Sequence, residues 1–243
     1  MKKVIIIGAT SGIGLELAKL YVQNGDRVGV TGRRQNLLDD IHQKFPLQVV
    51  TECFDVTGPE NIPHVQALIN HLGGVDLLIY NAGYGEISEA LDWKIDRQTT
   101  LTNVNGFVEI VNFIFNYFKE RGEGQIAATS SVASIRENSM APAYSASKAF
   151  LSMYMAGLHL KAVKLRKRNP RTEIYISDIL PGYVRTKMSK GRGRFWEASV
   201  QKASRQIFNA IQKKRRKTYV THRWVFIAWM LKWIPYFVVK RFG

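Results

Sequence analysis

Short apolar runs alternate with longer amphipathic stretches along most of the chain. The run at residues 3–7 (KVIII) is β-branched and almost wholly apolar, which is typical of a strand covered on both faces of a parallel sheet. Similar runs predict further strands at residues 27–31, 47–52, 75–79, 125–129, 173–180 and 218–220. The amphipathic stretches predict helices at residues 13–23, 59–72, 95–120, 143–167 and 199–211. This alternation predicts one α/β domain with a doubly wound parallel sheet (a Rossmann fold), three layers (αβα) and about seven strands.

A glycine-rich turn, GATSGIG, joins the first predicted strand to the first helix. Its glycines leave backbone N–H groups bare at the start of a helix, where the helix dipole also favours an anion. The turn therefore predicts a binding site for the pyrophosphate of a dinucleotide, and a purely structural turn is the alternative. The residues assigned to this loop are Gly8, Thr10, Ser11, Gly12, Ile13 and Gly14.

The end of the second predicted strand indicates which dinucleotide is bound. Proteins that prefer NAD usually place an acid near this point to bind the ribose 2′-hydroxyl. This chain has Arg33 and Arg34 instead. Two guanidinium groups suit a 2′-phosphate, so NADP(H) is favoured over NAD(H). The alternative is that the two arginines merely begin a solvent-facing helix.

Tyr144 is the centre of the predicted chemistry. Lys148 follows it by one helical turn, and Ser131 lies thirteen residues before it, at the end of the fifth predicted strand. The pKa of a free phenol is about 10, and a lysine at i+4 on the same helical face can lower it. The serine hydroxyl could hold the oxygen whose proton is moved.

The spacing of Tyr144 and Lys148 is not sufficient by itself to identify a site. The same spacing occurs in Tyr183/Lys187, which follows a helix-breaking Pro-Gly pair, and in Tyr236/Lys240 in the tail. Only Tyr144 begins a long amphipathic helix directly after a strand that ends in serine.

Several motifs in register make the chain similar to the short-chain dehydrogenase/reductase family over about residues 3–190. The glycine loop resembles the family's cofactor loop, and Asp55-Val56 resembles its adenine-binding pair. Tyr80 replaces the first asparagine of the family's Asn-Asn-Ala-Gly motif. The further residues that the resemblance assigns to the site are Asn81, Ala82, Gly83, Asn103, Ser131, Tyr144, Lys148, Pro181, Gly182, Val184 and Thr186.

The resemblance implies a catalytic set of Asn103, Ser131, Tyr144 and Lys148. Tyr144 would be the general acid/base. Lys148 would lower the tyrosine pKa and hold the nicotinamide ribose, and Ser131 would bind the reacting oxygen. Asn103 would support a water in the proton relay, although its position in a predicted helix suggests a solvent-facing side chain. Pro181, Gly182, Val184 and Thr186 would hold the nicotinamide carboxamide.

The net charge of +16 comes entirely from the last third of the chain. Residues 1–160 contain 13 Lys+Arg and 16 Asp+Glu, whereas residues 161–243 contain 22 and 3. Such asymmetry favours a nucleic acid, an anionic membrane surface or an acidic substrate as partner, and a solvated basic face is the alternative.

The tail, residues 223–243, is predicted to be an extension of a catalytic domain at residues 1–222, whose substrate lid lies around residues 187–205. From Trp224 to Val239 it is rich in aromatic residues but shorter than the roughly 20 apolar residues that span a bilayer. An amphipathic segment lying on a membrane is one interpretation. A cover over the substrate pocket or a subunit interface is the other.

These patterns predict an NADP(H)-dependent oxidoreductase that interconverts a carbonyl and an alcohol, with an apolar or lipid-like substrate. The rival hypothesis is a non-catalytic dinucleotide-binding redox sensor, or a nucleic-acid-binding protein that uses the basic third. We expect a homo-oligomer, no nucleic-acid partner and no metal. The first apolar run is too short for a signal peptide, so we expect a cytoplasmic location, with peripheral contact at the inner face of a membrane as an option. The single cysteine, Cys53, is expected to be a packing residue.

Overall fold

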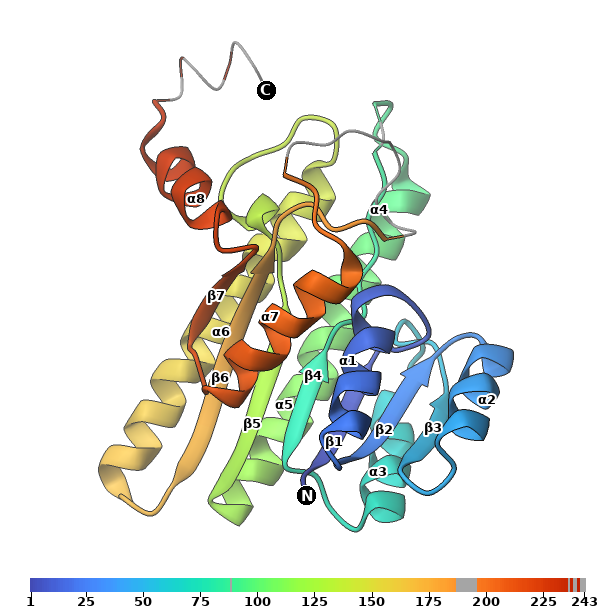
Figure 1. Ribbon diagram of the computed structural model, residues 1–243. Coiled ribbons are helices and arrows are strands. Elements are labelled where there is room, and N and C mark those ends of the chain that lie inside the picture. The colour runs from blue at the N-terminus through green and yellow to red at the C-terminus, as the bar shows by residue number, and fades with distance from the viewer. Residues whose placement is uncertain (88, 187–195, 236, 238–239, 241–243) are drawn as a thin grey trace.

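The computed structural model describes residues 1–87, 89–186, 196–235, 237 and 240. Over these residues the chain forms a seven-stranded sheet in the order β3-β2-β1-β4-β5-β6-β7 (Figure 1), and all neighbouring strands are parallel. The strands are β1 (Lys3–Ile7), β2 (Arg27–Gly32), β3 (Val49–Cys53), β4 (Leu77–Tyr80), β5 (Glu123–Thr129), β6 (Glu173–Pro181) and β7 (Lys217–Val220). The strand order changes direction between β1 and β4. Ligands of such folds bind at the carboxyl ends of the strands, next to this switch point.

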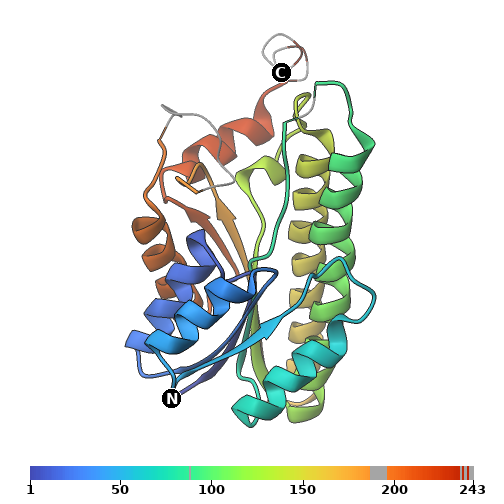
Figure 2. The ribbon, with the colours of Figure 1, turned by 90° about the vertical axis from the view of Figure 1, so that its right-hand side faces the viewer.

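Two layers of helices cover the two faces of the sheet (Figure 2). One layer contains α1 (Gly12–Gln23), α2 (Gln35–Lys44) and α7 (Val200–Gln212). The other contains α3 (Asn61–Leu72), α5 (Gly106–Arg121) and α6 (Pro142–Arg168). The shorter helices are α4 (Trp93–Thr100), a 3₁₀ turn (Val132–Ser134) and α8 (Trp224–Trp233). The predicted three-layer Rossmann fold is thus confirmed.

Strand β1 shows why the sheet needs both layers. Val4 and Ile6 are fully buried in the core beneath α1, while Ile5 and Ile7 are fully buried in the core beneath α3 and α5. Successive side chains of a strand point to opposite faces, so a continuous apolar run requires a cover on each side.

The helix predicted at residues 95–120 differs in one important respect. The chain is helical from α4 to α5, but a wide π-type turn, Leu101–Asn105, joins them. Such turns shift the helical phase and are frequent at functional sites. The hydroxyl of Tyr80 donates a hydrogen bond of 2.7 Å to the carbonyl of Thr102 within this turn. Buried Tyr80 therefore braces the irregular segment.

The packing role predicted for Cys53 is wrong, because its side chain is exposed. Cys53 is the last residue of β3, which lies at one edge of the sheet. A side chain at the end of an edge strand has no neighbouring strand on one side, which leaves it open to solvent.

Candidate active site

The glycine loop forms a tight cradle between β1 and α1. Gly8 and Gly12 have φ angles of +84° and +58°, which favour glycine. A Cβ on Gly8 would collide with the backbone of Ala82, and a Cβ on Gly14 would collide with the Gly8 carbonyl oxygen. The cradle therefore accepts no side chains at these positions, and its shape is fixed by backbone packing.

The start of α1 suits the phosphates of a dinucleotide. Ser11 is its N-cap residue, but no side chain caps the first N–H groups, and the first turn contains no acid. Uncapped N–H groups at a helix N-terminus are a favourable environment for an anion. The side chain of Asn81 supports the cradle by donating to the Gly8 carbonyl at 2.9 Å. These residues fit a nicotinamide dinucleotide.

Arg34 lies against this loop. Its Nη2 donates to Thr10 Oγ1 at 2.6 Å and to Ser11 Oγ at 3.0 Å. Arg33 instead forms an ion pair of 3.3 Å with Asp55. The two neighbouring arginines thus have different partners, and only Arg34 joins the two loop hydroxyls into one donor cluster.

Asp55 and Val56 follow β3 and so lie at the carboxyl ends of the strands, as the glycine cradle does. Burial opposes ionisation of Asp55, but hydrogen bonds from Thr57 and the charge of Arg33 outweigh it and keep the pKa of this carboxyl below its ordinary value. Val56 is buried, and the close approach of its carbonyl leaves no room for a side chain on Gly106. Through Val56, the predicted adenine-binding pair therefore packs against the start of α5.

Tyr144 and Ser131 come together, as the sequence predicts. Tyr144 lies in the first turn of α6, and Ser131 follows β5. Burial raises the pKa of Tyr144 above its ordinary value, and its hydrogen bond with Ser131 acts in the opposite direction. Desolvation of the phenol outweighs this hydrogen bond, so the net shift is opposite to the lowering that was expected from Lys148.

Lys148 is buried beside Tyr144. Its Nζ lies 5.8 Å from the centroid of the Tyr144 ring and donates to the Thr129 carbonyl at 2.9 Å. Burial lowers the pKa of Lys148 to about 8, although the charge of Asp178 opposes this shift. The ammonium is therefore close to its titration range at neutral pH.

Asn103 is fully buried in the π-type turn. Polar residues of a regular helix usually face solvent, but the π-type turn rotates Asn103 towards the loop after β4. Its Oδ1 accepts from the N–H of Tyr84, and its Nδ2 donates to the carbonyl of Tyr84, both at 2.8 Å. Nδ2 also donates to Ser147 Oγ at 2.9 Å. Asn103 thus ties the loop containing Gly83 to α6.

The segment after β6 reaches back to the glycine loop. A Cβ on Gly12 would lie 3.4 Å from the Cγ2 methyl group of Thr186. Pro181 ends β6, and Gly182 donates from its N–H to the Val220 carbonyl at 2.6 Å. Val184 is buried in the core. The predicted carboxamide segment and the cofactor cradle therefore lie at one place in the fold.

Several residues at this edge were not identified from the sequence. Asp178 is buried, and its carboxylate accepts from Ser130 Oγ at 2.5 Å and from Ser152 Oγ at 2.6 Å. Gly85 packs so closely on the Tyr144 ring that a Cβ would overlap it. Trp224 packs in the same way on Gly182. These contacts join distant parts of the chain, and no local sequence pattern indicates them.

Some predicted features lie outside the described residues. They are residues 187–195 of the predicted lid and, from the two other tyrosine–lysine pairs, Lys187 and Tyr236. Among the described residues, no group of three or more His, Cys, Asp or Glu side chains could hold a metal ion.

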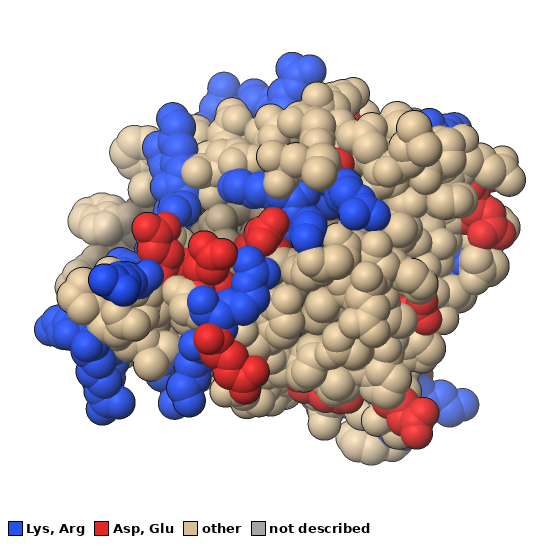
Figure 3. Space-filling view, turned by 90° about the horizontal axis from the view of Figure 1, so that it is seen from below, with Lys and Arg blue, Asp and Glu red and all other residues tan. Residues whose placement is uncertain are grey.

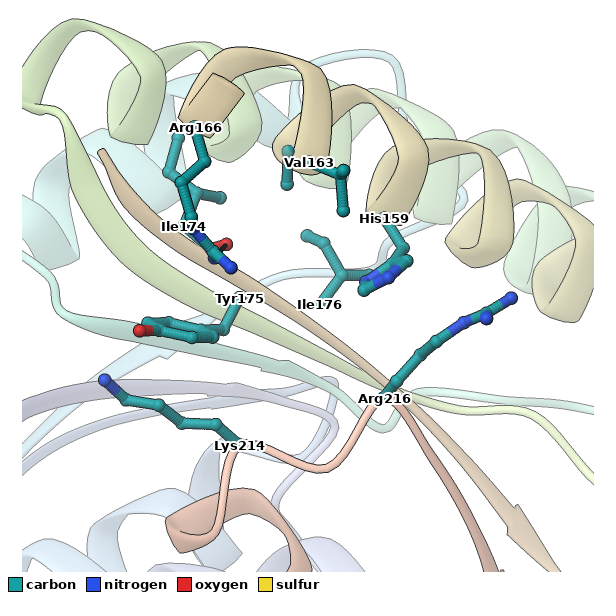
Figure 4. Close-up of a pocket in the computed structure, with 9 residues that line it drawn as sticks. His159, Val163, Arg166, Ile174, Tyr175, Ile176, Lys214 and Arg216 are labelled. Carbon is teal, nitrogen blue, oxygen red and sulfur yellow. Dashed lines mark hydrogen bonds between the residues drawn. The ribbon is translucent and has the colours of Figure 1, made fainter. Parts of the chain in front are cut away.

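A pocket of about 190 Å³ lies near the other end of α6 (Figure 4). It begins at His159, fifteen residues after Tyr144, which corresponds to roughly 22 Å along the helix. His159, Arg166, Lys214 and Arg216 line it, so it is separate from the site of Tyr144.

Comparison with known proteins agrees with this geometry. The model of the short chain dehydrogenase family matches residues 2–195. The chain belongs to the short-chain dehydrogenase/reductase family. A member of this family is an NAD(P)-dependent oxidoreductase, and the fold and cradle described above are those that such an enzyme needs.

Individual relatives show the same family at moderate identity. An uncharacterized oxidoreductase of Myxococcus xanthus is 34% identical over 191 residues, covering 76% of this chain and 73% of that protein. The 11-beta-hydroxysteroid dehydrogenase 1A of Arabidopsis thaliana is 28% identical over 259 aligned residues, covering 95% of this chain and 71% of that protein. A solved structure of a short chain dehydrogenase from Burkholderia cenocepacia J2315 in complex with NADP has a TM-score of 0.82 at 22% identity, covering 99% and 96% of the two chains.

Proposed function

We propose that this short-chain dehydrogenase interconverts a carbonyl and an alcohol with NADP(H), and that Tyr144 is its general acid/base. The observation that carries the proposal is the contact between Tyr144 and Ser131 at the sheet edge where the glycine cradle and Thr186 also meet. The rival hypothesis of a non-catalytic sensor would not require Tyr144 together with a buried serine and a buried lysine at this one place.

Each residue has a distinct role in the proposed reaction. When bound, the nicotinamide group supplies a hydride to the carbonyl carbon or accepts one from the alcohol carbon. The Tyr144 phenol donates its proton to the carbonyl oxygen during reduction and takes it back during oxidation. Ser131 donates a hydrogen bond to the same oxygen. With its pKa raised above the ordinary value, the phenol carries its proton at neutral pH, as the reduction step requires.

Lys148 and Asn103 hold and orient the site. The Lys148 ammonium, when protonated, is a hydrogen-bond donor close to the tyrosine ring, in a position suited to the nicotinamide ribose. Asn103 fixes the backbone of Tyr84 and thereby the adjacent glycines. We propose that the water of the proton relay, implied by the family resemblance, binds between these two residues.

The preference for NADP(H) rests on Arg34 and its two hydroxyl partners. Together, Arg34, Thr10 and Ser11 offer one guanidinium and two hydroxyl groups to a 2′-phosphate. Such charge-assisted bonds are about twice as strong as neutral ones. Solved structures of the same fold hold NADP in one case and NADH in another, so Arg34 and its partners alone carry the proposed preference.

An apolar substrate is supported by the surroundings of Gly182 and by one relative. The rings of Tyr183 and Trp224 meet edge to face, with centroids 5.5 Å apart, where the chain leaves β6. The Arabidopsis relative carries a hydroxysteroid dehydrogenase name, which denotes an apolar substrate class. Exposed apolar side chains on α6, such as Phe150 and Met153, support a homo-oligomer. We propose that the enzyme acts in the cytoplasm.

The test uses the full-length protein in two stages. Fluorescence titration measures the affinities for NADPH and NADH, and a panel of carbonyls and alcohols then measures turnover. We expect NADPH to bind more tightly. We expect Tyr144→Phe to abolish turnover while leaving NADPH affinity within about twofold, because the phenol oxygen moves the proton but the ring keeps its packing. Appreciable turnover by Tyr144→Phe would refute the assigned role. Binding of NADPH without turnover of any compound would favour the sensor.

A further inference from the structure

Helix α8 presents an apolar stripe to the outside of the molecule. Its exposed side chains are Val225, Phe226, Trp229, Met230 and Trp233, of which Phe226 and Trp233 are 74% and 73% accessible. At 100° per residue these five positions cover an arc of about 140°. The buried residues Trp224 and Ala228 lie outside this arc. A contiguous exposed stripe of this kind marks an interaction surface.

Two contacts fix α8 to the edge that carries the candidate active site (Figure 1). At its start, the buried indole of Trp224 packs on Gly182 and against the Tyr183 ring. At its end, the guanidinium of Arg136 donates to the carbonyl of Ile234. Arg136 belongs to the loop between Ser131 and Tyr144. The position of the stripe is therefore coupled to the segment that carries the proposed catalytic residues.

Basic residues flank the stripe on both sides. By the same helical geometry, Lys232 lies about 20° beyond one border of the arc and Arg223 about 20° beyond the other. Both are exposed, as is Lys240 after the helix. The sequence contains no Asp or Glu after Glu197. This pattern complements a surface that is negatively charged and apolar just beneath, with long basic side chains extending to the charged layer.

The opposite edge of the sheet has a different character. Seen from below, acidic and basic side chains lie next to one another there (Figure 3). Arg121 pairs with Asp76 at 3.2 Å and with Glu123 at 3.0 Å, and Lys214 pairs with Glu173 at 3.5 Å. This edge also bears exposed basic residues of segments 167–171 and 213–216, so positive charge alone does not distinguish the two edges. The edge that bears α8 is the one that combines basic side chains with the exposed apolar stripe.

We propose that α8 docks the protein peripherally on an anionic lipid bilayer, with its aromatic residues at headgroup depth and the active-site edge facing the lipid. None of the described helices is long and apolar enough to cross a membrane, and a helix of ten residues is only about 15 Å long. The helix therefore lies in the interface. A second copy of the chain is a poorer partner, because a symmetric contact would bring basic flanks together. The docking does not depend on the proposed function. Docking would also let an apolar substrate pass from the bilayer to the site, and this consequence alone rests on the proposed function.

Vesicle flotation of the full chain tests the docking without any need for turnover. The vesicles contain phosphatidylcholine alone or mixed with phosphatidylglycerol. We expect the protein to float only with the anionic vesicles. The variant Phe226→Ser/Trp229→Ser/Trp233→Ser should lose binding by roughly tenfold or more, since it removes the apolar contact. Unchanged thermal melting is expected, because all three side chains are exposed.

Two control variants isolate the contributions of apolar contact and of charge. Leu47→Ser, which removes an even more exposed apolar side chain far from α8, should bind as the native protein does, whereas Trp229→Ser should bind more weakly. Arg223→Glu/Lys232→Glu should reduce binding by roughly tenfold. Lys44→Glu/Lys213→Glu makes the same change in net charge at the opposite edge and should have a smaller effect.

Three outcomes would overturn the proposal. One is a native protein that fails to float with anionic vesicles. Another is equal binding to both vesicle types, which would show that the basic flanks have no role. The third is a change in oligomeric state of the triple α8 variant in the absence of lipid, which would identify the stripe as a subunit contact. A docked protein that binds no NADPH would instead count against the proposed function alone.

Discussion

Asn103 binds both hydrogen-bonding groups of the Tyr84 backbone, accepting from its N–H and donating to its carbonyl at 2.8 Å each. This clamp holds the loop in which Gly83 approaches the Lys148 ammonium and Gly85 covers the Tyr144 ring. In the structure, Asn103 is thus a positioning residue for two proposed catalytic groups. Its position in a π-type turn, with Tyr80 bonded to the preceding carbonyl, makes this arrangement possible.

Replacement of Asn103 by alanine should therefore lower both stability and activity. The change leaves the partly buried N–H and carbonyl of Tyr84 without their partner, which should lower the free energy of unfolding by about 2 kcal/mol. Urea unfolding measures this effect. Asn116→Ala, on the exposed face of α5, is the control and should change the value by less than about 0.5 kcal/mol. Equal effects of the two variants would show that the clamp contributes nothing.

Gly85→Ala should disturb Tyr144 directly. The added methyl group would overlap three atoms of the tyrosine ring, so the ring or the loop must move. We expect kcat/KM for the best carbonyl of a panel to fall by about tenfold or more, with a stability loss of about 1–3 kcal/mol. Gly157→Ala is the matched control, because nothing lies within 4 Å of a Cβ at that site in α6. It should stabilise the protein by up to about 1 kcal/mol and leave turnover unchanged. Native turnover by Gly85→Ala would show that the site tolerates the shift.

The sequence was sufficient to predict the fold, and it predicted where in that fold the candidate site residues that follow strands would lie. The apolar run of β1 needs cover on both faces, and the glycine loop and Ser131 come directly after strands, where ligands of this fold bind. Burial of Asn103 could not be predicted, because the π-type turn changes the helical phase. The contact of Trp224 with Gly182 joins residues 42 positions apart, and periodicity carries no information about such contacts. The Tyr144 pKa was predicted in the wrong direction because desolvation depends on the whole fold.

Arg34→Asp should change the choice of cofactor. The substitution removes the guanidinium that binds Thr10 and Ser11, and it offers a carboxylate to a ribose hydroxyl. We expect the Kd for NADPH to rise by about 10- to 100-fold, while the Kd for NADH changes little or falls. Arg33→Ala should have a smaller effect, since Arg33 pairs with Asp55. Fluorescence titration of both dinucleotides measures these constants. An equal loss of affinity for NADPH and NADH in Arg34→Asp would contradict the proposed 2′-phosphate site.

Lys148 should make the stability of the protein depend on alkaline pH. Its pKa is about 8 in the folded protein, against an ordinary value of 10.5, so between these values the unfolded chain binds more protons than the native one. The free energy of unfolding therefore rises with pH in this window, and the contribution of Lys148 is least favourable below pH 8. Relative to Lys148→Met, the native protein should gain up to about 3 kcal/mol between pH 7 and pH 11, as measured by urea unfolding. Lys164→Met, an exposed lysine of the same helix, should follow the native curve in parallel. A constant difference between the native protein and Lys148→Met across this range would show that Lys148 does not titrate in the window.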